Sequence, residues 1–170
     1  MDNRVIKTIK ARTSTRSYLD KKVPLKKLQA VLEAGKYAPS AKNRQICHIL
    51  ALRNKRYVSA LSKLADEHLG REAYYGATTL ILVYGPRDDG FTIQDATCIL
   101  QNMFIAAESL NLASCWINQT DALLNTKEGL KLRKKLGLNE NDYVVGTCIL
   151  GYTNQKGEVK PRKEDMIKII

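Results

Sequence analysis

The sequence has few of the features that mark metal sites, disulfide scaffolds or membrane spans. Its four cysteines form no CxxC pair, and neither of its two histidines stands at the spacing of a metal ligand. No run of about 18 apolar residues occurs, so the sequence predicts no membrane-spanning helix. The first residues lack the long apolar core of a secretory signal peptide. These absences predict structural thiols and a cytoplasmic location.

Glycine-rich phosphate loops and internal repeats are also missing. Neither GxGxxG nor GxxxxGK[ST] occurs, which argues against a Rossmann dinucleotide site and against a P-loop. No repeat, linker or low-complexity tract divides the chain, so we expect a single domain over residues 1–170. Hydrophobic residues make up 44% and charged residues 26%, a balance that excludes intrinsic disorder, collagen and coiled coil.

Positive charge is abundant and unevenly placed. The formal net charge is +11, and residues 1–56 contain fifteen Lys/Arg against three Asp/Glu. A basic surface of this kind suggests a polyanion, an anionic membrane or a phosphate-bearing ligand, but it also suits a solvated face that only confers solubility. Only Tyr18 and Tyr37 are interleaved with the early basic residues, too few for a platform on which nucleic-acid bases stack.

Hydrophobic periodicity predicts helices that alternate with strands. Helical spacing occurs before Arg12, after Pro24, around residues 58–65, over residues 92–111, and in a basic helix that Gly137 ends. Apolar runs predict four strands, at residues 46–52, 80–84, 115–117 and 143–150. Gly35 is placed to end or loosen the last turn of the helix after Pro24. A doubly wound sheet is the default for this order, but periodicity alone supports only one layered domain with four or five strands.

Three polar clusters interrupt the pattern at the boundaries between elements. They are Arg12–Tyr18, Ala38–Gln45 and Glu158–Lys163. In the first, two arginines and several hydroxyls could hold a phosphate, and an extended backbone would point Arg12, Ser14 and Arg16 the same way. In the second, amide side chains could read the edge of a heterocycle. The third could complete an anion site, although each cluster taken alone also fits an exposed turn or a solvated charge run.

Five short patterns run in a fixed order through nearly the whole chain. R-x-S-x-R-x-aromatic is matched by Arg12, Ser14, Arg16 and Tyr18, and A-P-S-x-x-N-x-Q by Ala38, Pro39, Ser40, Asn43 and Gln45. D-x-x-x-x-x-Q-N is matched by Asp95, Gln101 and Asn102, and C-W-I is matched by residues 115–117. The last pattern, G-Y followed by K-P-R-K, is matched by residues 151–152 and 160–163. In this order and spacing, the sequence resembles the nitroreductase family of flavin (FMN) enzymes.

The resemblance implies an α+β fold with a central mixed or antiparallel sheet of four or five strands flanked by helices. It also implies a homodimer with FMN at the interface. The residues that would bind the FMN phosphate and support the charged flavin are Arg12, Ser14, Arg16, Lys160 and Arg162. The residues that would border the isoalloxazine ring from the partner chain are Pro39, Ser40, Asn43 and Gln45. The backbone at Trp116, Ile117 and Asn118 would approach the reactive edge of the flavin.

The activity implied by the resemblance is electron transfer from NAD(P)H to a small electron-poor acceptor, such as a nitroaromatic or a quinone. The flavin carries this chemistry, so no catalytic side chain, metal, nucleic acid or membrane is expected, and Arg16 is the candidate that tunes the flavin. Two alternatives stay open. One is the same flavin fold with other chemistry, such as dehalogenation or a biosynthetic step. The other is a basic module that binds nucleic acid or another anion, with an affinity that falls steeply with salt.

Three features depart from the family pattern. Ile46 stands where a proline often follows the glutamine, and Asn118 replaces the glycine that is common after C-W-I. Only seven residues follow Lys163. We therefore expect Asn118 to crowd or re-tune the flavin edge, and we expect the tail to be too short to wrap a partner or to cover a substrate.

Overall fold

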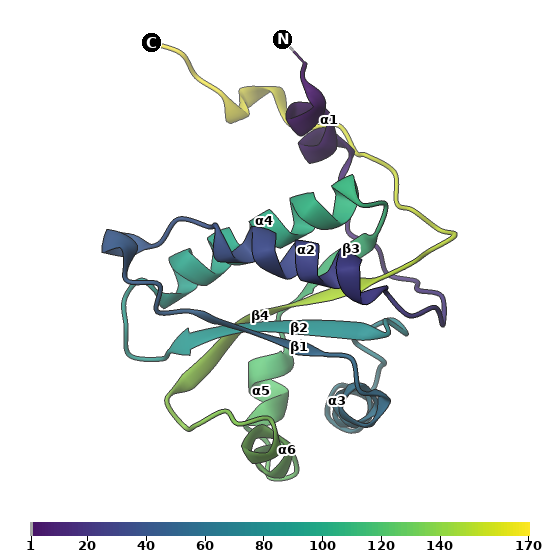
Figure 1. The fold of residues 1–170 in the computed structure, drawn as a ribbon, viewed down its shortest axis with the longest axis vertical. Coiled ribbons are helices and arrows are strands. Elements are labelled where there is room, and N and C mark those ends of the chain that lie inside the picture. The colour runs from purple at the N-terminus through teal and green to yellow at the C-terminus, as the bar shows by residue number, and fades with distance from the viewer. Residues whose placement is uncertain (1) are drawn as a thin grey trace.

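A four-stranded antiparallel sheet lies between two layers of helices (Figure 1). The computed structural model describes residues 2–170. The strands are β1 (His48–Leu52), β2 (Thr79–Pro86), β3 (Ala113–Ile117) and β4 (Asp142–Gly151), and their order in the sheet is β1-β2-β4-β3. All three neighbouring pairs are antiparallel, so the default of a doubly wound parallel sheet is wrong. Periodicity could not show this, because it locates strands without fixing the direction in which they pair.

The helices cover both faces of the sheet. They are α1 (Arg4–Ala11), α2 (Leu25–Lys36), α3 (Lys55–Leu69), α4 (Thr92–Ser109), α5 (Thr120–Leu124) and α6 (Gly129–Lys135), with 3-10 turns η1 (Ala41–Asn43) and η2 (Glu164–Met166). Figure 1 shows α2 and α4 on one face and α3, α5 and α6 on the other. The sequence analysis missed α5, because five residues are too few for a periodic signal. Along residues 2–170, no helix is both long and apolar enough to cross a membrane.

The alternation of side chains along β2 divides the core in two. Leu80 and Leu82 face the α3 layer, whereas Ile81 and Val83 face α2 and α4, and all four side chains are fully buried. This confirms the buried strand predicted from the uninterrupted apolar run. Cys115 and Cys148 are buried free thiols in these two halves, and burial raises the pKa of the Cys148 thiol.

Gly35 has a different role from the one that its position suggested. α2 continues through Gly35 to Lys36, so the glycine does not end the helix. A Cβ at Gly35 would lie 2.9 Å from Met103 Cγ of α4 and 3.1 Å from Ile49 Cδ1 of β1. The missing side chain therefore allows α2 to approach α4 closely. At the same contact, the Asn102 amide donates to the Ala34 carbonyl at 3.1 Å, which gives Asn102 a role in helix packing.

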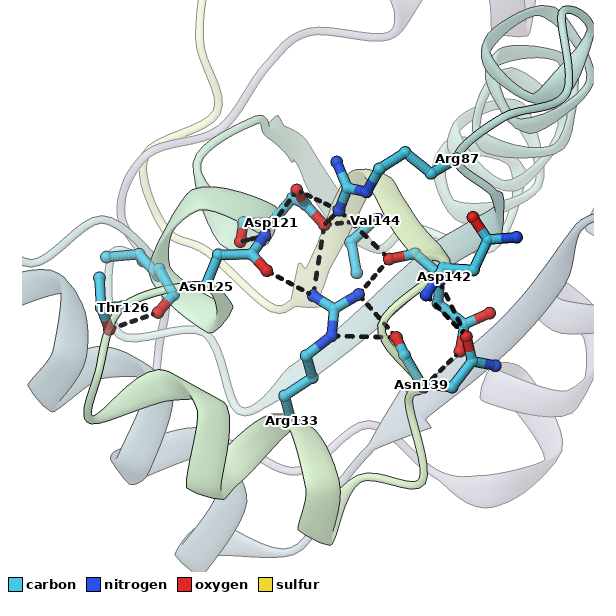
Figure 2. Close-up of polar contacts among 10 residues, drawn as sticks. Arg87, Asp121, Asn125, Thr126, Arg133, Asn139, Asp142 and Val144 are labelled. Atoms are coloured by element: carbon cyan, nitrogen blue, oxygen red, sulfur yellow. Dashed lines mark hydrogen bonds and ion pairs between the residues drawn. The ribbon is translucent and has the colours of Figure 1, made fainter.

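A buried ion-pair network attaches α5 and α6 to the start of β4 (Figure 2). Asp121 of α5 is 8% exposed, and it accepts from Arg87 Nη2 at 3.1 and 3.2 Å and from the Val144 amide at 3.0 Å. Arg133 of α6 is 3% exposed, and its Nη1 lies 3.6 Å from Asp121 Oδ1. Its Nε and Nη2 donate to the Asn139 carbonyl at 3.1 and 3.0 Å. These partners compensate the two charges for their loss of water.

Candidate functional site

The Arg12–Tyr18 cluster runs along the outer edge of β3. Ser14 forms a parallel bridge with Ser114, and the Thr15 amide donates to the Ser114 carbonyl at 3.0 Å. Pairing with a strand keeps this segment extended, so Thr15 is buried while Ser14 and Arg16 are exposed. Ser14 and Arg16 share the outward face predicted from a period of two, whereas Arg12, the third residue of that prediction, is only partly exposed.

Two guanidinium groups of this cluster lack an acidic partner. Arg12 follows the last residue of α1, and its Cζ lies 6.0 Å from the centre of the Phe104 ring of α4. Within residues 2–170, neither Arg12 nor Arg16 forms an ion pair with a carboxylate. Arginine forks beside the exposed hydroxyl of Ser14 are a donor set that fits a phosphate group.

The C-terminal tail returns to the same edge of the sheet. The Leu19 amide donates to the Tyr152 carbonyl at 2.8 Å, and Lys156 forms an ion pair with Glu108 near the end of α4. Farther along the tail, Gly157 lies against the first cluster, because a Cβ there would be 3.6 Å from Thr13 Cβ and 3.7 Å from the Ser14 carbonyl oxygen. Lys160 and Arg162 follow on this path and are exposed, with Arg162 Nη1 donating to the Lys160 carbonyl at 2.7 Å. The first polar cluster, Arg12–Tyr18, and the third, Glu158–Lys163, therefore lie on the same side of the folded protein.

The C-W-I segment lies next to the first cluster. The Trp116 ring lies 6.3 Å from the Phe104 ring, which is the ring that Arg12 overlies. Trp116 Nε1 donates to Asn118 Oδ1 at 3.4 Å, a long hydrogen bond at the exposed end of β3. Ile117 is buried in the opposite core layer, so only its backbone can reach a ligand at this edge.

The Ala38–Gln45 cluster lines a cleft beside the N-terminal end of α4. The cleft has a volume of about 420 Å³, within the range of small-molecule sites. Its lining includes Pro39, Ser40, Gln45, Cys47 and Asp95. Asn43 is exposed beside it, and the Gln45 amide nitrogen donates to Asn43 Oδ1 at 3.0 Å.

Asp95 contributes an unpaired acceptor to this cleft. It is 4% exposed, and its Oδ1 accepts from the Ala41 amide at 3.0 Å. Its Oδ2 is buried and has no hydrogen-bond partner within the described residues, so it can accept from a donor on a ligand. Burial also raises the pKa of the Cys47 thiol to about 11, which keeps this thiol protonated at neutral pH. The sequence analysis matched Asp95 to a motif but gave neither residue a role in the site.

The polar clusters lie at opposite ends of α4. Asp95, beside the Ala38–Gln45 cleft, is in the first turn of this helix, and Glu108, which holds the tail, is in its last turn. At a rise of 1.5 Å per residue, Asp95 is about 14 Å from Phe104, which Arg12 overlies, and about 20 Å from Glu108. One chain therefore brings the first and third clusters together with Trp116, but it does not bring Pro39–Gln45 to them.

Comparison with known proteins settles the family. The model of the nitroreductase family matches residues 9–152. This chain belongs to the nitroreductase family. The matched range contains every predicted site residue except Lys160 and Arg162, which lie in the tail beyond it.

Solved nitroreductases share the fold over its whole length. A nitroreductase with bound FMN from Bacteroides fragilis NCTC 9343 is 35% identical, covers 99% of this chain and 100% of its own, and has a TM-score of 0.91. Another with bound FMN, from Desulfitobacterium hafniense DCB-2, is 24% identical with a TM-score of 0.90 and full coverage of both chains. The NADPH-flavin oxidoreductase of Vibrio harveyi is 28% identical over 94% of this chain and 70% of its own length. The nitroreductase-like α+β fold expected from the motifs is confirmed.

Some of the early basic residues of this nitroreductase-family chain have structural partners. Lys21 and Lys27 place their ammonium groups 4.6 and 5.5 Å from the centre of the Tyr152 ring. Lys27 also donates to the Leu110 carbonyl at 2.7 Å, and Arg53 donates to the Val23 carbonyl at 2.9 Å. These cations help to hold the N-terminal segment and the tail on the domain. Lys21, Lys27 and Arg53 therefore do more than form a solvated face, which was one of the interpretations that the sequence allowed.

Proposed function

We propose that the chain is an FMN-dependent oxidoreductase that passes electrons from NAD(P)H to a small electron-poor acceptor, such as a nitroaromatic or a quinone. The observation that carries this proposal is the unpaired donor set of Arg12, Ser14 and Arg16, in a family whose B. fragilis member at 35% identity holds FMN. FMN, when bound, supplies the redox chemistry, and the protein supplies position and charge.

Five residues bind the phosphate and the flavin from one chain. Arg12, Ser14 and Arg16 hold the phosphate at the edge of β3, and Lys160 and Arg162 close the site from the tail. Arg16 is exposed and has no acidic partner among residues 2–170, so it can also stabilise negative charge that develops on the reduced flavin.

A second copy of the chain completes the site. The separation of about 14 to 20 Å along α4 keeps Pro39, Ser40, Asn43 and Gln45 of one chain away from its own phosphate cluster. These four residues border the ring from the partner, while the backbone at Trp116–Asn118 lies at its reactive edge. Val5 and Ile9 expose apolar surface on α1, which a second copy would cover.

The test of the proposed function begins with the purified protein. We expect a yellow dimer that releases FMN on denaturation, with its mass measured by analytical ultracentrifugation. It should oxidise NADH or NADPH when a nitroaromatic or quinone acceptor is present. A colourless protein that cannot be loaded with FMN would contradict the proposal, as would a loaded protein that oxidises neither nicotinamide with any acceptor.

Arg16→Ala tests the phosphate site. We expect the variant to bind FMN about 10-fold more weakly, because it loses a charge-assisted hydrogen bond worth about 1.4 kcal/mol in this exposed position. The midpoint potential of the bound flavin should also fall. Equilibrium dialysis and spectroelectrochemistry measure the two quantities. The control is Lys26→Ala, which removes an exposed cation from α2. Unchanged affinity and potential in Arg16→Ala would remove Arg16 from the site.

A further inference from the structure

Three residues of the Ala38–Gln45 loop have left-handed backbone conformations. The φ angles are 55° at Lys42, 54° at Asn43 and 52° at Gln45, and none of these residues is glycine. At Lys42 and Gln45 such a conformation costs on the order of 1–3 kcal/mol and persists only where surrounding contacts hold it, whereas asparagine adopts it more readily. Three within four positions show that the loop is held away from its intrinsic backbone preference.

Arg44 lies between these residues and forms a two-point ion pair with Asp89, in the turn that follows β2. Its Nη1 donates to Asp89 Oδ2 at 2.7 Å, and its Nη2 donates to Asp89 Oδ1 at 3.0 Å. The guanidinium carbon also lies 5.5 Å from the centre of the Phe91 ring. The hydrogen bonds from Arg44 lower the pKa of the Asp89 carboxyl, so this group is ionised at neutral pH. These two parallel hydrogen bonds, which we call the fork, fix the orientation of the guanidinium group as well as its distance from the carboxylate.

Asp89 is itself fixed in the turn between β2 and α4. The Phe91 amide donates to Asp89 Oδ1 at 2.9 Å, and the Thr92 amide donates to the Asp89 carbonyl at 3.3 Å. The fork therefore connects a strained loop to the rigid start of α4. A second connection joins the same two elements, since the Ala41 amide donates to Asp95 Oδ1.

The held conformation orients the two amide side chains that the proposed function assigns to the flavin ring. The Gln45 backbone amide donates to Ser40 Oγ at 3.1 Å, and the Gln45 side chain donates to Asn43 Oδ1 at 3.0 Å. Within residues 2–170, the side-chain NH2 group of Asn43 and the side-chain oxygen of Gln45 have no other partner, so they can bind a ligand with donors and acceptors on one edge.

We propose that the Arg44–Asp89 fork, acting with the Ala41–Asp95 hydrogen bond, preorganises the loop by holding residues 42–45 in their strained conformation, so that Asn43 and Gln45 are in place for the ring of FMN. Arg44 is a positioning residue, since it acts through the loop. If the loop were relaxed, fewer molecules would have it in the conformation that binds the ring, and it would have to be reordered on binding. The apparent affinity for FMN would then fall in proportion to the lost population of that conformation. The ligand in this inference rests on the proposed function, whereas the strained loop and the fork do not.

The test compares Arg44→Lys and Asp89→Asn with the wild type. Lysine keeps the charge of Arg44 but cannot form the fork. We expect the FMN dissociation constant to rise 3- to 10-fold in both variants, with the melting temperature of the flavin-free protein nearly unchanged. Hydrogen exchange of a peptide covering residues 41–46 in the flavin-free protein should become faster, because its amide hydrogen bonds depend on the held loop.

A second substitution distinguishes strain from simple loss of a contact. Lys42→Gly, added to Arg44→Lys, removes the cost of the left-handed conformation at one position. It should restore part of the FMN affinity and part of the protection from exchange. Lys42→Ala is the matched control, since it removes the same exposed side chain but keeps the cost, so it should restore neither.

The outcomes separate this inference from the proposed function. Unchanged exchange in Arg44→Lys overturns the fork as the element that holds the loop, whether or not FMN binds. Faster exchange with unchanged FMN affinity overturns preorganisation and leaves the proposed function standing. A wild-type protein that binds no FMN overturns the proposed function and the flavin part of this inference together. In that case, faster hydrogen exchange in Arg44→Lys that Lys42→Gly reverses and Lys42→Ala does not would still show that the fork holds the strained loop.

Discussion

Arg133→Met is expected to lower the free energy of unfolding by about 3–5 kcal/mol, the usual result of breaking a buried ion pair from one side. Arg133 is 3% exposed, and its removal leaves the Asp121 carboxylate with less compensation in a buried place. It also leaves the Asn139 carbonyl without the two donations that it now accepts. Methionine keeps much of the side-chain length and the helix propensity, so the loss reports mainly the missing charge and donors.

The measurement is urea denaturation followed by circular dichroism, with Arg87→Met as the matched control. Arg87 donates to the same carboxylate, but its side chain is 43% exposed. Because water reaches the Arg87 side chain and can replace part of its contact with Asp121, this control should lose less stability than Arg133→Met. Equal losses in the two variants would show that burial of Arg133 is not what makes its ion pair important.

Gly146→Ala is expected to destabilise the protein by about 1–3 kcal/mol and to move Trp116. A Cβ at Gly146 would lie 2.6 and 2.8 Å from Cε2 and Cζ2 of the Trp116 ring and 2.9 Å from Leu100 Cδ1. These separations are shorter than real contacts permit, so the ring must shift. Because Trp116 donates to Asn118, the shift also disturbs the end of β3, and we expect weaker FMN binding.

Trp116 is the only tryptophan of the chain, so its fluorescence reports the displacement directly. The emission maximum and the unfolding midpoint of Gly146→Ala should both change. Gly90→Ala is the control, because a Cβ at Gly90 would meet nothing within 4 Å. An unchanged emission spectrum in Gly146→Ala would contradict the close packing of Trp116 on β4.

Local patterns predicted most of the elements and part of the site. The uninterrupted apolar run at residues 80–84 is strand β2, and the spacing of polar residues from Arg12 to Arg16 matches an extended segment at the edge of the sheet. Both depend on neighbours in the sequence, whose periodicity can be read directly. The order and spacing of the motifs identified the family that the comparison then confirmed.

Features that depend on distant partners could not be predicted. In the segment KLRKK, Arg133 looks like one more exposed cation, and only the loop at residues 139–142 and the Asp121 carboxylate make it a buried one. Arg44 likewise resembles part of a basic turn, because Asp89 is distant in the sequence. The left-handed loop could not be predicted either, because of its three residues with positive φ only Asn43 is of a type that is enriched there.

The division of the polar clusters between the two ends of α4 has a genetic consequence for the proposed dimer. A chain altered at Arg16 and a chain altered at Asn43 would each form homodimers in which both flavin sites bind FMN more weakly. In a mixed dimer, one site receives both defects, while the other combines the intact phosphate cluster of one chain with the intact loop of the other. Co-expression of the two altered genes would therefore give mixed dimers with one site of full FMN affinity, which neither gene provides alone, whereas two alterations within the same cluster would not complement each other.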